Sequence, residues 1–166
     1  MRPSRRVDAP PPNILQLRNG SRSAHWRERL LALRTMRRQI DEGRSKLAFL
    51  RLASRLIHDK SNACRWQALI VVGEFVREYP DRVWSIFKRA APFSDDDLRD
   101  GLAAVILEHL LEHHFESTLS QLRACIREGD DTVADILSRC WPFGAAKRKW
   151  QRVEAILAKW HDGSIS

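Results

Sequence analysis

The chain has 166 residues, 43% of them apolar, and a formal net charge of +8 from 29 Lys and Arg against 21 Asp and Glu. This length and composition are typical of one globular domain and exclude a disordered or fibrous chain. No stretch of 18 apolar residues is present, which excludes a membrane-spanning helix, and three cysteines without a Cys-x-x-Cys pair favour a soluble cytoplasmic protein that needs no cofactor.

The first 23 residues are rich in helix breakers. The run Pro10–Pro12 cannot continue a helix, and Gly20 disfavours one further on. The segment lacks the apolar core of a secretory signal, but its Arg and Ser content leaves an organellar targeting segment open. We therefore predict a flexible basic tail over residues 1–23, followed by a single domain over residues 24–166.

The rest of the chain has the apolar spacing of helices, with three or four residues between successive apolar positions, and no useful run that alternates as a strand does. Gly43, Pro80 and Pro92 mark boundaries between these helices. The fold class is therefore expected to be all-α. Eight helices are predicted, over about residues 24–42, 45–57, 62–79, 81–91, 96–113, 115–127, 131–141 and 145–160.

Two of these helices resemble each other at a fixed offset of 34 residues. Arg65 corresponds to Arg99, and Val71 corresponds to Val105. A period of about 34–36 residues built from two helices is the length of an α-solenoid unit. The sequence therefore favours stacked antiparallel helix pairs, with an irregular helical bundle as the alternative.

Four strings carry a resemblance to a known class: RWQAL at 65–69, VGE at 72–74, LEHLLEHHF at 107–115 and CWPFG at 140–144. Over about residues 62–144, the chain resembles HEAT/armadillo-like α-helical repeat proteins of bacterial, mostly uncharacterised type. The resemblance implies a concave surface lined by the second helix of each pair. It also implies a partner that is most often a protein and less often a nucleic acid, as in a HEAT-like DNA glycosylase group whose catalytic residues have no counterpart here.

Charge is distributed unevenly along the chain, because both ends are basic whereas residues 94–135 carry a net charge of −8. An acidic surface of this size can bind a basic protein. We therefore favour a non-catalytic adaptor or regulator that binds a protein partner through its concave face or through an acidic surface over residues 94–116. The candidate partner-binding residues are Trp84, Asp96, Asp97, Glu108 and Glu112.

The basic ends suggest an alternative function in binding nucleic acid. Arginine makes bidentate contacts with phosphate, and the two basic segments would form one patch if the fold brought the ends together. The opposing interpretation is that the arginine stems cover apolar surface while their charged heads pair with the acidic residues. The candidate residues are Arg27, Arg34, Arg37, Arg38, Lys147, Arg148 and Lys149.

One string, His109-Leu110-Leu111-Glu112-His113, matches the H-x-x-E-H pattern of inverted zinc peptidases. Two histidines at i and i+4 can bind zinc on one helical face while the glutamate activates water. His109 also lies near the centre of a wide apolar arc, which favours a core histidine instead. A zinc hydrolase is therefore the least favoured function, and no metal site is expected.

Overall fold

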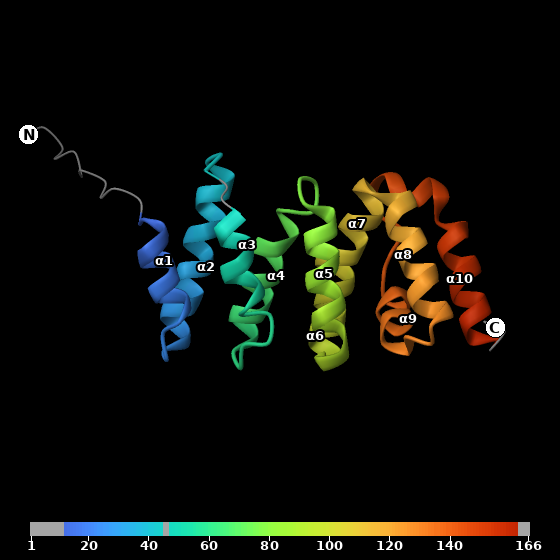
Figure 1. The fold of residues 1–166 in the computed structure, drawn as a ribbon, viewed down its shortest axis with the longest axis horizontal. Coiled ribbons are helices and arrows are strands. Elements are labelled where there is room, and N and C mark those ends of the chain that lie inside the picture. Colours follow the sequence, from blue (N-terminus) through green and yellow to red (C-terminus); the bar gives the residue numbers. More distant parts are fainter. Residues whose placement is uncertain (1–11, 45–46, 163–166) are drawn as a thin grey trace, which may run out of the picture.

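The computed structural model describes residues 12–44 and 47–162, and every regular element in these ranges is helical (Figure 1). The predicted all-α fold class is confirmed for the described residues. The first half contains α1 (Ile14–Ser21), α2 (Trp26–Asp41), α3 (Leu47–Ser54), α4 (Asn62–Gly73) and α5 (Pro80–Ala90). The second half contains α6 (Asp96–Gly101), a π-helical segment (Leu102–Leu107), α7 (Glu108–His113), α8 (Phe115–Arg127), α9 (Asp131–Ser138) and α10 (Gln151–His161). Short 3₁₀ turns occupy Ala91–Phe93 and Gly144–Lys149.

Most predicted helices lie where the apolar spacing placed them, but several differ in detail; for example, the helices predicted to end at about 57 and 141 end at Ser54 and Ser138. The helix predicted over 62–79 ends at Gly73, and turns continue the chain to Pro80. The helix predicted over 96–113 is continuous, but its middle is π-helical. The helix predicted over 145–160 begins as a 3₁₀ turn and becomes α-helical only at Gln151.

The prediction of a flexible tail over residues 1–23 is wrong for residues 14–21, which form α1, while residues 1–11 lie outside the described ranges. The side chain of Asn13 accepts the N–H of Gln16 at 3.0 Å, and the Gln16 side chain accepts the N–H of Asn13 at 2.8 Å. This capping box starts the helix just after the prolines, where proline does no harm. Leu17 is buried and α1 contacts α2, so tertiary packing stabilises this short helix in addition to the capping box.

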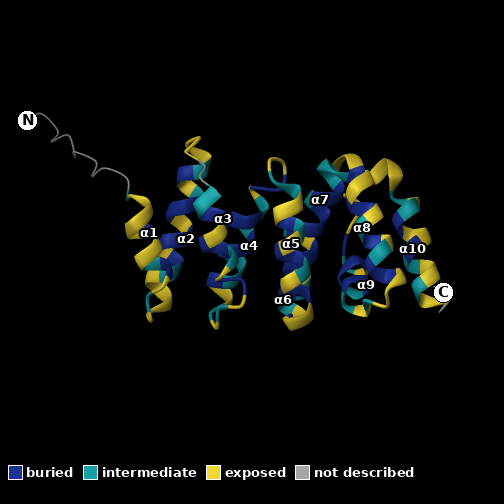
Figure 2. Cartoon of the chain, in the orientation of Figure 1, coloured by how far each residue is buried: buried dark blue, intermediate teal, exposed yellow. Residues whose placement is uncertain are grey.

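The helices follow one another along the long axis of the molecule in roughly the order of the chain (Figure 1). α2 packs against α4, and α4 packs against the π-helical segment, while α1 contacts both α2 and α3. Figure 2 shows buried residues along the inner sides of the helices and exposed residues along their outer sides. One hydrophobic core extends along the described residues, and its largest fully buried side chains include Phe49, Phe75 and Phe87.

Two glycines allow α4 to approach the helix that follows α5. A Cβ atom at Gly101 would lie 2.5 Å from Cδ1 of Leu69, and one at Gly73 would lie 3.1 Å from the side chain and the carbonyl oxygen of Val105. Both distances are shorter than ordinary van der Waals contact. The absence of a side chain at these positions therefore sets how closely the two helices pack.

Candidate functional site

Three arginines occupy the same position in three alternate helices. Arg29, Arg65 and Arg99 are each the fourth residue of α2, α4 and α6, respectively. Each reaches an aspartate 30 to 36 residues further along the chain. We call these three side chains the helix-linking arginines, because each ties its own helix to a later segment.

The contacts of the helix-linking arginines are short. Arg29 donates from Nε and Nη2 to the carboxylate of Asp59 at 2.5 and 2.8 Å. The side chain of Asp59 is only 4% exposed, and the arginine hydrogen bonds hold its pKa below the ordinary value of 3.8. The other two make similar pairs: Arg65 with Asp95 and Asp97 at 2.9 Å, and Arg99 with Asp135 at 3.0 Å.

A fourth arginine, Arg139, forms ion pairs with three carboxylates that come from two helices. Its guanidinium lies 2.8 Å from Asp100, 2.9 Å from Asp96 and 3.2 Å from Asp135. Hydrogen bonds, with Asp100 the strongest contributor, raise its pKa above the ordinary arginine value. Much of the charge of the acidic segment is therefore neutralised within the molecule.

The residues considered for a protein partner all have internal contacts. Asp96 pairs with Arg139, and Asp97 accepts hydrogen bonds from Arg65 and from the indole of Trp66. Glu108 is buried and accepts the N–H of Trp141 at 2.8 Å. Glu112 lies 3.4 Å from His113, and Trp84 is half-buried and stacks on Phe87.

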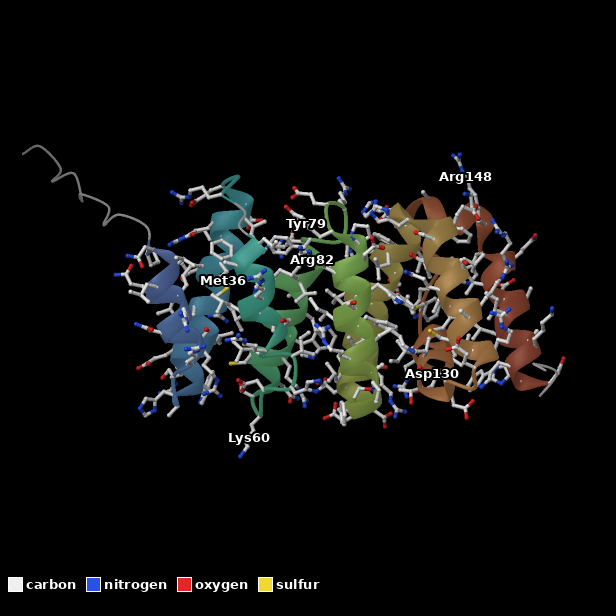
Figure 3. The ribbon with its side chains drawn as sticks, viewed as in Figure 1. Met36, Lys60, Tyr79, Arg82, Asp130 and Arg148 are labelled. Atoms are coloured by element: carbon white, nitrogen blue, oxygen red, sulfur yellow. The ribbon has the colours of Figure 1, made fainter. Side chains whose placement is uncertain are left out.

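The candidates for nucleic-acid binding are split between the two ends of the molecule. α2 lies near one end, whereas Arg148 projects beside α10 at the other (Figures 1 and 3). The two basic segments therefore do not form one patch. On α2, Arg37 pairs with Asp41 and Glu74, Arg38 lies 4.0 Å from Glu42, Arg27 covers the ring of Trp26, and Arg34 is exposed.

In the second basic segment, Lys147 and Arg148 are exposed, but Lys149 is paired. Its ammonium group lies 3.1 Å from Glu116, which also accepts two hydrogen bonds from Arg152. These contacts, those from Arg152 first, lower the pKa of Glu116 from 4.5 to about 2. One of the three candidate cations is therefore already engaged.

The H-x-x-E-H string lies along α7, and its surroundings give no support to a zinc site. Nε2 of His113 accepts a hydrogen bond from Nε of Arg77 at 3.1 Å, so this atom is not free to bind a metal. Burial lowers the pKa of His113, Glu112 raises it, and Arg77 lowers it further. In the described ranges, no group of three or more His, Cys, Asp or Glu side chains has the geometry to hold a metal ion.

The cluster that the sequence did not predict lies on α1, α3 and α5 and on the residues that directly follow α1 and α3. Six arginines line three adjoining grooves there, and within residues 12–44 and 47–162 none of the six guanidinium groups has a hydrogen bond or an ion pair. Of the acidic residues in these described ranges, Asp81 alone lines the same grooves. We call this surface the arginine face; its members are Arg18, Arg22, Arg51, Arg55, Arg82 and Arg89.

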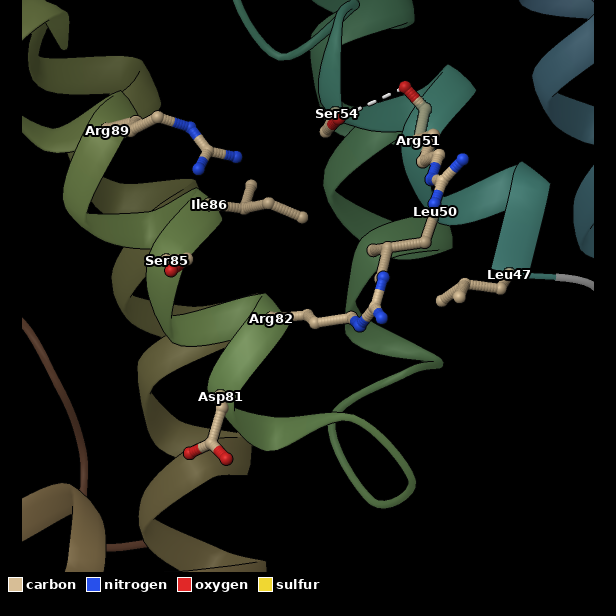
Figure 4. Close-up of a pocket in the computed structure, with 9 residues that line it drawn as sticks. All are labelled: Leu47, Leu50, Arg51, Ser54, Asp81, Arg82, Ser85, Ile86 and Arg89. Carbon is tan, nitrogen blue, oxygen red and sulfur yellow. Dashed lines mark hydrogen bonds between the residues drawn. The ribbon is translucent and has the colours of Figure 1, made fainter.

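The central groove of the arginine face, of about 420 Å³, lies between α3 and α5 (Figure 4). Arg82 and Arg89 extend from α5 toward α3, whereas Asp81, which lies next to Arg82, points away from α3. Leu47, Leu50 and Ile86 add apolar surface between the cations. The groove therefore combines positive charge from both walls with an apolar lining.

The two neighbouring grooves are also lined by arginines and apolar side chains. Arg51 and Arg55 also line the groove toward α1, where Arg18 and Arg22 form the opposite side. A groove of about 570 Å³ continues along the ends of α3 and α5 and includes Arg55 and Arg89. A separate small groove of about 180 Å³ between α8 and α10 is also basic, lined by Arg123, Arg127 and Lys159.

No family model, curated protein or solved structure matches this chain. None of the helices in the described ranges combines the length and apolar character that crossing a bilayer requires. The function is therefore inferred from the geometry of the described residues.

Proposed function

We propose that this chain is a non-catalytic helical-repeat interaction module that holds an acidic partner against its arginine face. The proposal keeps the HEAT-like α-solenoid class expected from the sequence. It places the binding site on the arginine face instead of on the acidic surface over 94–116. The acidic surface over 94–116 is a weaker candidate, because Asp96, Asp97 and Glu108 already have partners within the chain. The partner is therefore acidic rather than basic.

The recurring arginine contacts support the repeat class. Successive units of a helical repeat contact mainly their neighbours, so equivalent residues make equivalent contacts. Arg29, Arg65 and Arg99 meet this expectation, because each is the fourth residue of its helix and each pairs with an aspartate 30 to 36 residues later. The close approach at Gly73 and Gly101 lies between two helices of the same series.

The single observation that carries the function is the arginine face. Arg18 lies in the last turn of α1, and Arg22 directly follows that helix. Arg51 and Arg55 are placed in the same way at the end of α3, so two pairs of like charges line one groove and repel one another. Within the described residues, no carboxylate offsets these pairs. An anionic partner removes this repulsion on binding, and its association is accelerated by the positive potential.

The experiment measures binding of labelled polyanions, namely heparin oligosaccharide, polyglutamate and a nucleic-acid oligomer, by fluorescence anisotropy. Wild-type protein is compared with the triple variant R51Q/R82Q/R89Q. We expect at least one polyanion to bind, and the triple variant to bind it at least tenfold more weakly. The control D81N removes the one acidic lining residue and should bind as tightly as wild type or slightly more tightly. Absence of binding to every polyanion, or equal binding by the triple variant, would overturn the proposal.

A further inference from the structure

An exposed aromatic pair lies at one end of the arginine face. Phe93 belongs to the 3₁₀ turn after α5, and its side chain is 79% exposed. His58, which follows α3, meets it edge to face, with ring centroids 6.3 Å apart and an interplanar angle of 86°. Both rings line the same groove as Arg55 and Arg89. An exposed phenylalanine in a groove that two arginines also line provides a flat apolar surface in a cationic setting.

We infer that the acidic partner is a single-stranded nucleic acid. Its phosphates contact Arg51, Arg55, Arg82 and Arg89, and an unpaired base stacks on Phe93. The inference rests on the proposed function and specifies the partner of the same surface.

Phosphate is favoured by the choice and spacing of the cations. Among the described residues, the cationic side chains that line the three grooves are all arginines, whose planar guanidinium forms paired hydrogen bonds with phosphate oxygens. With a rise of about 1.5 Å per residue, Arg82 and Arg89 lie about 10 Å apart along α5, whereas Arg51 lies in α3 and Arg55 in the turn that directly follows it. The cations therefore form two rows, one on each wall, along which the charges of an extended chain can run.

The aromatic pair favours unpaired bases over other acidic partners. Proteins that bind single strands combine a basic groove with aromatic rings on which bases stack. The bases of a duplex are already stacked on one another and cannot reach Phe93, and a polyglutamate chain has no ring to place there. Leu50 and Ile86, which line the groove together with the arginines, offer apolar contacts to the sugars or bases.

The experiment compares four fluorescein-labelled probes by anisotropy: a twelve-nucleotide single-stranded DNA, the RNA of the same sequence, the corresponding duplex, and polyglutamate of matched charge. The variants are F93A, F93L and H58A in the full chain, with helicity checked by circular dichroism. F93L is the matched control, because it keeps an apolar side chain and removes only the ring. Phe93 is largely exposed, so these variants are expected to fold.

We expect wild type to bind a single strand at least tenfold more tightly than the duplex or polyglutamate. F93A and F93L should each weaken single-strand binding about tenfold and leave polyglutamate binding unchanged, with a smaller loss in H58A. The DNA and RNA arms show which sugar is preferred.

Two results would overturn the inference while leaving the proposed function intact. One is equal or tighter binding of duplex or polyglutamate, with a loss in R51Q/R82Q/R89Q. The other is single-strand binding that F93A and F93L do not change. If no polyanion binds wild type, the inference and the proposed function both fail.

Discussion

The helix-linking arginines and the arginine face use the same side chain in opposite ways. Arg29, Arg65 and Arg99 each form ion pairs of 3.0 Å or less within the chain, whereas Arg51 and Arg82 have no such partner among the described residues. Position explains the difference. Arg29, Arg65 and Arg99 lie in the initial turns of their helices, and each faces an aspartate from a later part of the chain. Arg51 and Arg82 instead line grooves whose other charged residues are mostly arginines. Arginine content alone therefore does not show which charges are available to a partner.

The largest difference between the two groups should appear in stability. D59N removes the charged acceptor of Arg29, whose side chain is only 15% exposed, and we expect it to reduce the free energy of unfolding by about 2 kcal/mol. Urea denaturation followed by circular dichroism measures this. D81N, which changes an exposed aspartate beside the arginine face, is the control and should stay within about 0.5 kcal/mol of wild type. Equal losses of stability in D59N and D81N would show that the Arg29–Asp59 ion pair does not stabilise the fold more than an exposed aspartate does.

The pH dependence of stability sharpens the same contrast. The pKa of Asp59 is lower in the folded protein than its ordinary value of 3.8, mainly because Arg29 donates hydrogen bonds to it. The unfolded chain therefore takes up this proton first, so the stabilisation is complete above about pH 4 and is lost as the pH falls through the folded pKa. We expect D59N to flatten the stability profile below pH 4, whereas R51Q should leave its shape unchanged. Urea titrations between pH 2.5 and 6 measure both profiles.

A smaller effect is expected at Arg139. Its carboxylate partners Asp96 and Asp100 are 84% and 61% exposed, so solvent screens much of the attraction. R139Q should therefore reduce the free energy of unfolding by about 1 kcal/mol, and R89Q by no more than about 0.5 kcal/mol. Both variants remove one positive charge. Thermal unfolding of the two tests whether R139Q loses more stability than R89Q. A larger loss in R89Q would contradict the division between the two groups.

The smallest effect on stability is expected at the exposed pair of Glu116 and Arg152. The pKa of Glu116 is about 2, chiefly because Arg152 donates two hydrogen bonds to it. R152Q should raise this pKa toward 4.5, and the accompanying loss of stability should be the smallest of the series because both side chains are exposed to solvent. An NMR titration of the Glu116 side chain detects the shift. An unchanged pKa would show that the pair does not persist in solution.

The sequence predicted the helices well because apolar spacing and breakers act locally. It missed α1, since the prolines before Asn13 looked like the start of a tail and the Asn13–Gln16 capping box was overlooked. It found the correspondence of Arg65 with Arg99 but not that Arg29 belongs with them.

The candidate site was harder to predict than the helices. The six arginines of the arginine face are spread from Arg18 to Arg89, and no segment of the sequence concentrates them as α2 concentrates its own. Their common surface arises only when α1, α3 and α5 pack side by side. The basic residues that did stand out in the sequence, such as Arg37 and Lys149, are partly used in internal ion pairs.

The most direct test compares two triple variants with the same change in charge. R51Q/R82Q/R89Q removes three cations of the arginine face, and R27Q/R34Q/R148Q removes three exposed arginines elsewhere that have no ion pair among the described residues. Binding of a single-stranded oligonucleotide is measured at salt concentrations from 50 to 200 mM. We expect the first variant to lose at least tenfold in affinity and to reduce the salt slope by about 2, since each phosphate contact contributes about 0.7. The second should lose less than threefold. Equal losses in the two variants would show that net charge, and not the arginine face, determines binding.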